Sequence, residues 1–170
     1  MQQDVCVFEP GRNLPISGQA DVIVCGAGPA GVAAAVAAAS CGVSVILLES
    51  SAMPGGIMTS GMMPNVIDAA NKGGFLQKML HFLHANDAAG NYNSYVPETV
   101  KFFMESSLTK AGVRVRYNTL VCNVLKQGRE VAAVITESPA GREAFKGKIF
   151  IDCTGNGTAA ALAGCRYECG

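Results

Sequence analysis

Three glycines and one acidic residue stand at a spacing that favours binding of a dinucleotide. Gly26, Gly28 and Gly31 form a GxGxxG segment. In this pattern the first glycine permits a tight turn, the second lets the backbone approach a pyrophosphate, and the third allows a helix to pack closely on a strand. The N–H groups and the dipole at the start of that helix favour the phosphate charge. Glu49 lies about 20 residues further on, where a carboxylate accepts hydrogen bonds from ribose hydroxyls and disfavours the 2′-phosphate of NADP.

The elements around the glycines are those that the motif requires. Residues 21–25 form a continuous apolar run, typical of a strand in a parallel sheet that is covered on both faces. Residues 29–41 predict a buried helix with Gly42 at its C-terminal cap, and residues 43–48 predict a second strand. The segment 22–48 carries no charge, but its change from strand to helix to strand argues against a membrane span.

The rest of the chain alternates between helical and strand patterns after a loop-like segment at 50–71. Helical spacing predicts three further helices, at 73–86, about 97–112 and 158–163. Alternating and apolar runs predict four further strands, the first three forming a β-meander, at 113–117, 120–126, 131–137 and 148–152. The expected fold class is therefore α/β, Rossmann-like, with a central parallel sheet and a β-meander crossover.

Composition excludes several classes of function. Thirteen basic and thirteen acidic side chains balance, so no basic face indicates nucleic acid as a partner. Seven cysteines include no CxxC pair, and with only two histidines they predict no metal site. Cysteines scattered through apolar runs, without a signal peptide, indicate a reducing and therefore cytoplasmic compartment. No triad, carboxylate pair or P-loop is visible, so the catalytic residues are unknown.

Four segments together resemble one family of flavoproteins. Gly31 is followed by Ala35 and Gly42, as in the extended dinucleotide motif of glutathione-reductase-like proteins. MPGGIMTSG at 53–61 resembles the segment with two glycines that runs past the FAD pyrophosphate. Two further segments resemble the strand whose backbone meets adenine and the second FAD signature: TLVCNV at 119–124 and IDCTGNG at 151–157.

This resemblance is to the FAD-dependent oxidoreductase family, and it extends from about Asn13 to Gly170. Pro10, Gly11 and Pro15 interrupt residues 1–20, which we expect to be a lead-in segment, and residues 21–170 are expected to form an FAD-binding domain. The resemblance also implies FAD as cofactor, with the flavin taking a hydride or electrons from an unknown small-molecule substrate. Together with the glycine motif it gives these expected cofactor-binding residues: Gly26, Ala27, Gly28, Pro29, Ala30, Gly31, Glu49, Ser50, Gly55, Gly56, Ile57, Val121, Cys153, Thr154 and Gly155.

The sequence departs from the family pattern in three ways. Cys153 stands where alanine is usual, so a thiol lies near the flavin, although a small residue tolerated in a tight turn explains it better. Asn156 and Thr158 replace acidic residues. Family members also continue into a substrate region, so we expect this chain to be truncated and to have the remainder of a longer chain as a partner.

Two alternatives remain open. A non-catalytic module that binds NAD or FAD would show the same glycine motif. Four methionines near the second glycine segment either line a flavin or substrate pocket or simply fill gaps in the packing: Met53, Met58, Met62 and Met63.

Overall fold

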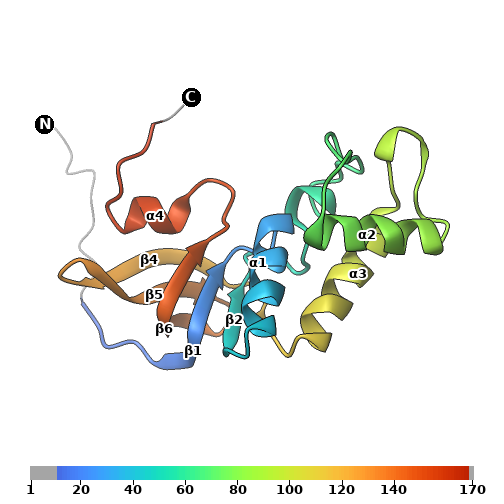
Figure 1. The fold of residues 1–170 in the computed structure, drawn as a ribbon. Coiled ribbons are helices and arrows are strands. Elements are labelled where there is room, and N and C mark those ends of the chain that lie inside the picture. Colours follow the sequence, from blue (N-terminus) through green and yellow to red (C-terminus); the bar gives the residue numbers. More distant parts are fainter. Residues whose placement is uncertain (1–10, 169–170) are drawn as a thin grey trace, which may run out of the picture.

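The computed structural model describes residues 11–168 of the 170-residue chain. Six strands form one sheet in the order β3-β2-β1-β6-β5-β4, with helices on both of its faces (Figure 1). The strands are β1 (Ile16–Cys25), β2 (Val45–Leu48), β3 (Arg114–Arg116), β4 (Leu120–Gln127), β5 (Glu130–Ser138) and β6 (Gly141–Asp152). The helices are α1 (Pro29–Ser40), α2 (Gly74–Ala85), α3 (Pro97–Lys110) and α4 (Thr158–Leu162), with short 3₁₀ turns η1 (Gly56–Met58) and η2 (Asn91–Asn93).

Four strands of the sheet are parallel, and this half of the fold positions the site. β1 pairs in parallel with β2 on one side and with β6 on the other, and β2 pairs in parallel with β3. The predicted strand–helix–strand unit is confirmed as β1, α1 and β2. Cys25 stands level with Leu48 of β2 and with Asp152 of β6. The turns that follow these three strands therefore leave the same edge of the sheet.

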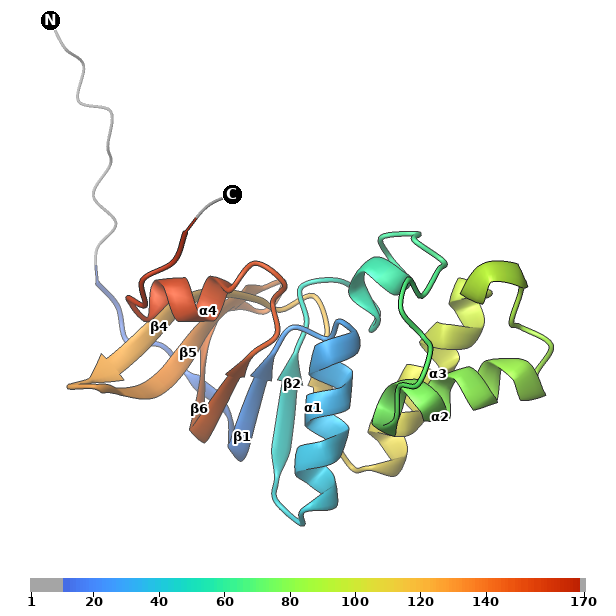
Figure 2. The same cartoon turned by 45° about the horizontal axis from the view of Figure 1, so that its top comes forward.

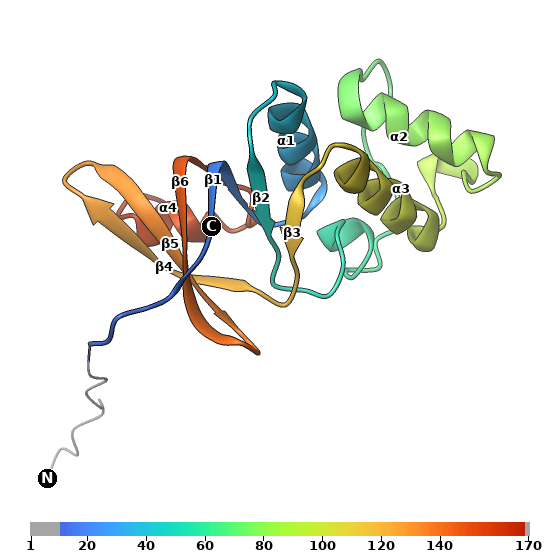
Figure 3. The ribbon, with the colours of Figure 1, turned by 90° about the horizontal axis from the view of Figure 1, so that it is seen from below.

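The two faces of β1 contribute to two separate apolar clusters, as the period of a strand requires. Val22 and Val24 pack towards α1, α2 and α3, whereas Ile23 and Cys25 pack towards the meander and α4. Figure 2 shows α1 lying along β2, with α2 and α3 beyond it and α4 across the meander. Figure 3 shows β4 and β5 at one end of the sheet and α2 and α3 near the other end, with β1 and β2 between them. Because the two apolar clusters cover both faces of β1 and β2, residues 22–25 of β1 and the whole of β2 are uninterrupted apolar runs.

The composition of the meander differs from the prediction. The predicted first strand, 113–117, is instead the parallel edge strand β3, and the meander consists of β4, β5 and β6. The predicted last strand at 148–152 is only the end of β6, which begins at Gly141. β6 pairs with β5 through its first half and with β1 along most of its length, so one long strand joins the two halves of the sheet.

The amino-terminal boundary also differs. β1 begins at Ile16, so the last residues of the predicted lead-in belong to the sheet. Residues 1–10 of that segment lie outside the described part of the chain. The alternative of a membrane span over 22–48 is wrong, because these residues form β1, α1 and β2. Within residues 11–168, no helix has the length and apolar character needed to cross a membrane.

Candidate cofactor site

A cavity of about 470 Å³ opens where the segments after β1, β2 and β6 meet at the carboxyl edge of the parallel strands. This is the edge at which open α/β sheets bind their ligands. Of the predicted residues, eleven line this cavity: Gly26, Gly28, Pro29, Ala30, Glu49, Ser50, Gly56, Val121, Cys153, Thr154 and Gly155. Within the described lining, Glu49 is the only charged side chain.

The three glycines of the first turn have different surroundings. Gly26 has φ +97°, and a Cβ there would overlap the backbone of Cys153. A Cβ on Gly31 would overlap the carbonyl oxygen of Gly26, so the helix approaches the turn as closely as glycine allows. Gly28 is different, because its φ of −63° suits any residue and a Cβ would meet nothing within 4 Å. Only the space above Gly28 is therefore left open, as approach of a phosphate requires.

The start of α1 supplies donors beside this space. The first hydrogen bond of the helix runs from the N–H of Val32 to the carbonyl of Gly28. The N–H groups of Ala30 and Gly31 come before this first hydrogen bond and have no partner within the helix. They stand at the positive end of the helix dipole, so they form a ready site for an anion.

The second glycine segment lies directly against the first. Gly55 donates its N–H to the carbonyl of Ala27 at 2.7 Å. A Cβ on Gly56 would stand 3.2 Å from Cα of Gly28. The two turns, which are far apart in the sequence, therefore pack against each other beside Gly28.

Glu49 ties these turns together. Its side chain is only 7% exposed. One carboxylate oxygen accepts the N–H of Ala27 at 2.6 Å, and the other accepts the N–H of Ser51 at 2.7 Å. The oxygen that accepts from Ser51 also accepts the hydroxyl of Ser50 at 3.2 Å, whereas the oxygen that accepts from Ala27 keeps a further lone pair. The predicted acceptance of a ribose hydroxyl is compatible with this second oxygen. The carboxylate thus also holds the glycine turn in place, a role that the sequence did not indicate.

Asp152 performs the same task at the end of β6. One oxygen of its carboxylate accepts the N–H and the hydroxyl of Thr154 at 3.0 and 2.8 Å, and the other accepts the N–H of Ala160 at 2.8 Å. Burial raises the pKa of Asp152, but these hydrogen bonds outweigh it, and its pKa lies below the usual value. The carboxylate therefore fixes the turn at 153–157 and the start of α4.

Cys153 lies in the cavity lining without the features of a reactive thiol. A Cβ on Gly31 would stand 3.2 Å from that of Cys153, so the cysteine faces the start of α1. Burial, and then the charge of Asp152, raise the pKa of this thiol. A protonated thiol is a poor nucleophile. This environment favours the interpretation of Cys153 as a small packing residue.

Four predicted residues do not line this cavity. Ala27 is fully buried, and it acts through its backbone bonds to Glu49 and Gly55. Gly31 and Gly55 lie behind the surface, and Ile57 is 60% exposed and lines a neighbouring cavity. Seven lining residues were not predicted: Leu48, Ser51, Ser60, Thr119, Leu120, Asn156 and Thr158. All of them flank predicted residues or belong to the same motifs, so a wider reading of each motif includes them.

The start of β4 reaches the cavity because it is bonded to the end of β2. Thr119 donates its N–H to the carbonyl of Glu49 at 2.8 Å, and Asn118 donates to that of Ser51 at 3.0 Å. Val121 is 5% exposed and lines the cavity beside them. The segment predicted to meet adenine therefore stands beside the residue predicted to meet ribose.

This geometry fits a long dinucleotide. The open space above Gly28 suits a pyrophosphate, and Glu49 and Gly56 line the same cavity. The family model described as FAD dependent oxidoreductase matches residues 21–170. The chain belongs to this family, and its cofactor is FAD.

Several solved structures share the fold. A geranylgeranyl bacteriochlorophyll reductase-like protein from Thermoplasma acidophilum is 21% identical over 88% of this chain and 43% of its own, with a TM-score of 0.59. A variant of a flavin-dependent brominase is 18% identical over 82% of this chain and 40% of its own, with a TM-score of 0.64. The THI4 protein of Thermovibrio ammonificans is 17% identical over 85% of this chain and 61% of its own, with a TM-score of 0.61.

The chain spans less than two thirds of the length of each of these proteins. No curated protein sequence matches it significantly.

Proposed function

We propose that this chain supplies the FAD site of an oxidoreductase whose flavin takes a hydride or electrons from a small organic substrate. The observation that carries the proposal is the cavity in which three turns from separate strands meet above Gly28. Two carboxylates, those of Glu49 and Asp152, hold these turns through backbone hydrogen bonds. Such preorganised backbone suits a cofactor that must be held in one position.

The residues have separate roles in this proposal. The N–H groups of Ala30 and Gly31 bind the pyrophosphate, and Glu49 accepts from the ribose hydroxyls. The backbone at Val121 meets the adenine, and Gly56 allows the chain to pass close to the phosphates. When bound, FAD supplies the redox chemistry, and the protein positions it and shields it from water.

Binding of FAD by the purified protein is the direct test. We expect the visible spectrum to show bound flavin that is reduced on illumination with a sacrificial donor, and calorimetry to show one FAD per chain. Gly28→Val should abolish binding, because its side chain fills the place of the pyrophosphate. Gly73→Val is the matched control, since Gly73 also precedes a helix, has φ −105° and has nothing within 4 Å of a Cβ. Absence of flavin absorbance and of binding heat in the wild-type protein would refute the proposal.

A non-catalytic module is the alternative from another class. Such a module would bind FAD or NAD without photoreduction of the flavin and without turnover. Titration with NAD and with FAD compares the affinities for the two cofactors. Tighter binding of NAD than of FAD contradicts the proposed function.

We also propose a cytoplasmic location, with a small-molecule substrate and the remainder of a longer chain as partners, and no nucleic acid or membrane. The balance of charge over the sequence supports the absence of a nucleic-acid partner. Free thiols support a reducing compartment, and those within the described part of the chain are Cys25, Cys41, Cys122, Cys153 and Cys165.

A further inference from the structure

A second cavity, of about 420 Å³, lies between α2, α3 and the segment that follows the second glycine turn. Its described lining has no charged side chain, and Asn65 is its one polar residue. The floor is formed by Met79 of α2 and Met104 of α3, both of which are buried, and Met63 stands at the rim. A space of this size exceeds the voids that close packing leaves in a core, so it is a binding-site candidate.

This apolar cavity adjoins the cofactor site. Pro29, the first residue of α1, lines both cavities. Ile57 and Met58, which line the apolar cavity, directly follow Gly56, which lines the cofactor site. The two cavities therefore lie on either side of one short stretch of chain, and a molecule in one is next to a molecule in the other.

The wall between them is preformed by hydrogen bonds. The hydroxyl of Tyr95 donates to the carbonyl of Met63 at 2.7 Å, and it lies 3.4 Å from that of Met58. Met63 donates its N–H to the carbonyl of Ile57 at 3.1 Å, and the buried hydroxyl of Thr59 donates to the carbonyl of Pro54 at 2.6 Å. These hydrogen bonds hold residues 54–63 in one compact conformation, so this wall of the cavity keeps its shape without a ligand.

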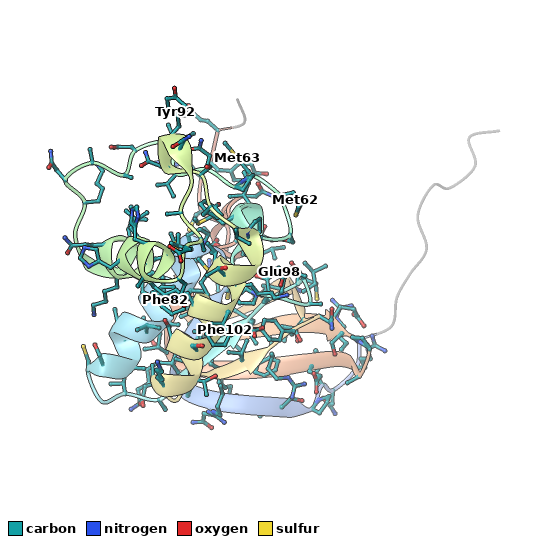
Figure 4. All side chains as sticks on the ribbon, turned by 90° about the vertical axis from the view of Figure 1, so that its right-hand side faces the viewer. Met62, Met63, Phe82, Tyr92, Glu98 and Phe102 are labelled. Carbon is teal, nitrogen blue, oxygen red and sulfur yellow. The ribbon has the colours of Figure 1, made fainter. Side chains whose placement is uncertain are left out.

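Aromatic contacts hold the opposite wall. Phe103 of α3 packs against Phe75 and Phe82 of α2, with ring centroids 5.3 and 5.2 Å apart. Figure 4 shows Phe82 and Phe102 together on these two helices, with Met62 and Met63 on the loop nearby. The methionines at the floor and the rim have flexible, polarisable side chains that adapt to ligands of different shape.

We propose that this apolar cavity binds the uncharged, hydrophobic body of the substrate that the flavin oxidises or reduces. The inference rests on the proposed function, because only a flavin in the neighbouring site makes the occupant a substrate. A charged ligand would lose its hydration here without gaining a counter-charge, so the lining selects against it. The mouth supports the assignment, since Ile67 is 82% exposed there and its burial by an apolar ligand is favourable.

The uncharged fluorophore N-phenyl-1-naphthylamine tests this proposal on the FAD-loaded protein. Its emission rises in apolar surroundings, and we expect saturable binding at one site. Met63→Glu should weaken this binding by about tenfold or more, because a carboxylate at the rim disfavours an apolar occupant. Val43→Glu is the matched control, since Met63 is 40% and Val43 is 37% exposed and Val43 is remote from the cavity lining. We expect the affinity for FAD to be unchanged in both variants.

The outcomes are distinguishable. If Met63→Glu does not fold, as judged by circular dichroism, Ile67→Glu at the mouth replaces it with the same expected loss. If the protein holds FAD but shows no saturable binding of the fluorophore, this inference is overturned and the proposed function stands. The same holds if another part of the protein fills the cavity. Equal affinities of the cavity variant and Val43→Glu also overturn the inference. A protein that binds the fluorophore but not FAD refutes the proposed function, and the assignment to a flavin substrate falls with it.

Discussion

Substitution of two glycines of the first turn by alanine should separate the binding of FAD from the stability of the fold. Gly28 and Gly31 are three residues apart, yet a Cβ meets nothing within 4 Å at Gly28 and overlaps the carbonyl oxygen of Gly26 at Gly31. We therefore expect Gly28→Ala to fold normally and to bind FAD weakly. Gly31→Ala should be destabilised before any ligand is added.

The magnitudes follow from these surroundings. Gly28 has φ −63°, which alanine adopts without strain, so the free energy of unfolding should stay within about 1 kcal/mol of the wild type. The new methyl group displaces the phosphate from at least one N–H donor. A charge-assisted hydrogen bond contributes roughly 1.5–3 kcal/mol, which corresponds to a dissociation constant about 10- to 150-fold higher. The overlap at Gly31 should cost about 1–3 kcal/mol of stability, as overpacking does.

Urea unfolding without FAD, followed by calorimetric titration with FAD, measures both quantities on the same preparations. Gly73→Ala serves as control, because Gly73 precedes α2 with the same open surroundings. An unchanged affinity of Gly28→Ala would show that the pyrophosphate does not pass over Gly28. Equal destabilisation of Gly28→Ala and Gly31→Ala would show that Gly31 does not approach the carbonyl of Gly26 as closely as the structure has it.

Three further predictions concern the ionisable groups. Glu49→Gln should lower the free energy of unfolding in urea by about 1.5–3 kcal/mol, because a charged acceptor of two backbone N–H groups is lost; an unchanged midpoint contradicts this role. The pKa of Asp152 is lower in the folded chain than in the unfolded chain, so its ionised form stabilises the fold above about pH 4 and this stabilisation is lost as the pH falls through the folded value. The difference in unfolding free energy between wild type and Asp152→Asn should therefore shrink on acidification below about pH 4, and a constant difference argues against the carboxylate as cause. Iodoacetamide followed by mass spectrometry should label the exposed Cys41 and Cys165 before Cys25, whose pKa is raised to about 12 by burial, then by the charges of Asp152 and Cys153; early labelling of Cys25 is the contrary result.

Local patterns predicted the part of the site that depends on short stretches of chain. The GxGxxG spacing placed Gly28 at the start of α1, and the apolar run at 21–25 placed this start at the edge of a parallel sheet. Glu49 follows β2 directly, so its register next to Gly26 is a consequence of the strand–helix–strand unit. Contact of these residues with the cofactor remains a prediction.

The errors lie where long-range pairing decides the structure. β3 reads as the first strand of a meander, but its residues pair with β2 after the helix α3. The first half of β6 carries the charged residues Arg142, Glu143 and Lys146, and Ala144 and Phe145 are its only apolar residues, so it lacks the apolar run of a buried strand. Its pairing with β5 and β1 supplies order that the local sequence does not reveal.

The apolar cavity depends on the same kind of information. Met63, Met79 and Met104 come from a loop and two helices, and only their assembly shows that they surround a common space. The sequence did not decide whether the four methionines near the second glycine segment line a pocket or fill gaps in the packing. The structure places Met58 and Met63 in the lining of this cavity, whereas Met53 and Met62 line neither of the two cavities described above.

The clasping of separate turns by Glu49 and Asp152 has a consequence for how the protein responds to its cofactor. β1 and β6 come from opposite ends of the described chain, so the site exists only when the whole sheet is assembled. FAD that binds only the folded chain therefore raises the free energy of global unfolding. The increase is about 1.4 kcal/mol for each tenfold excess of free FAD over its dissociation constant. The melting temperature of the protein therefore rises with the concentration of free FAD. In a cell that is short of flavin, a larger fraction of this chain would be unfolded at any moment.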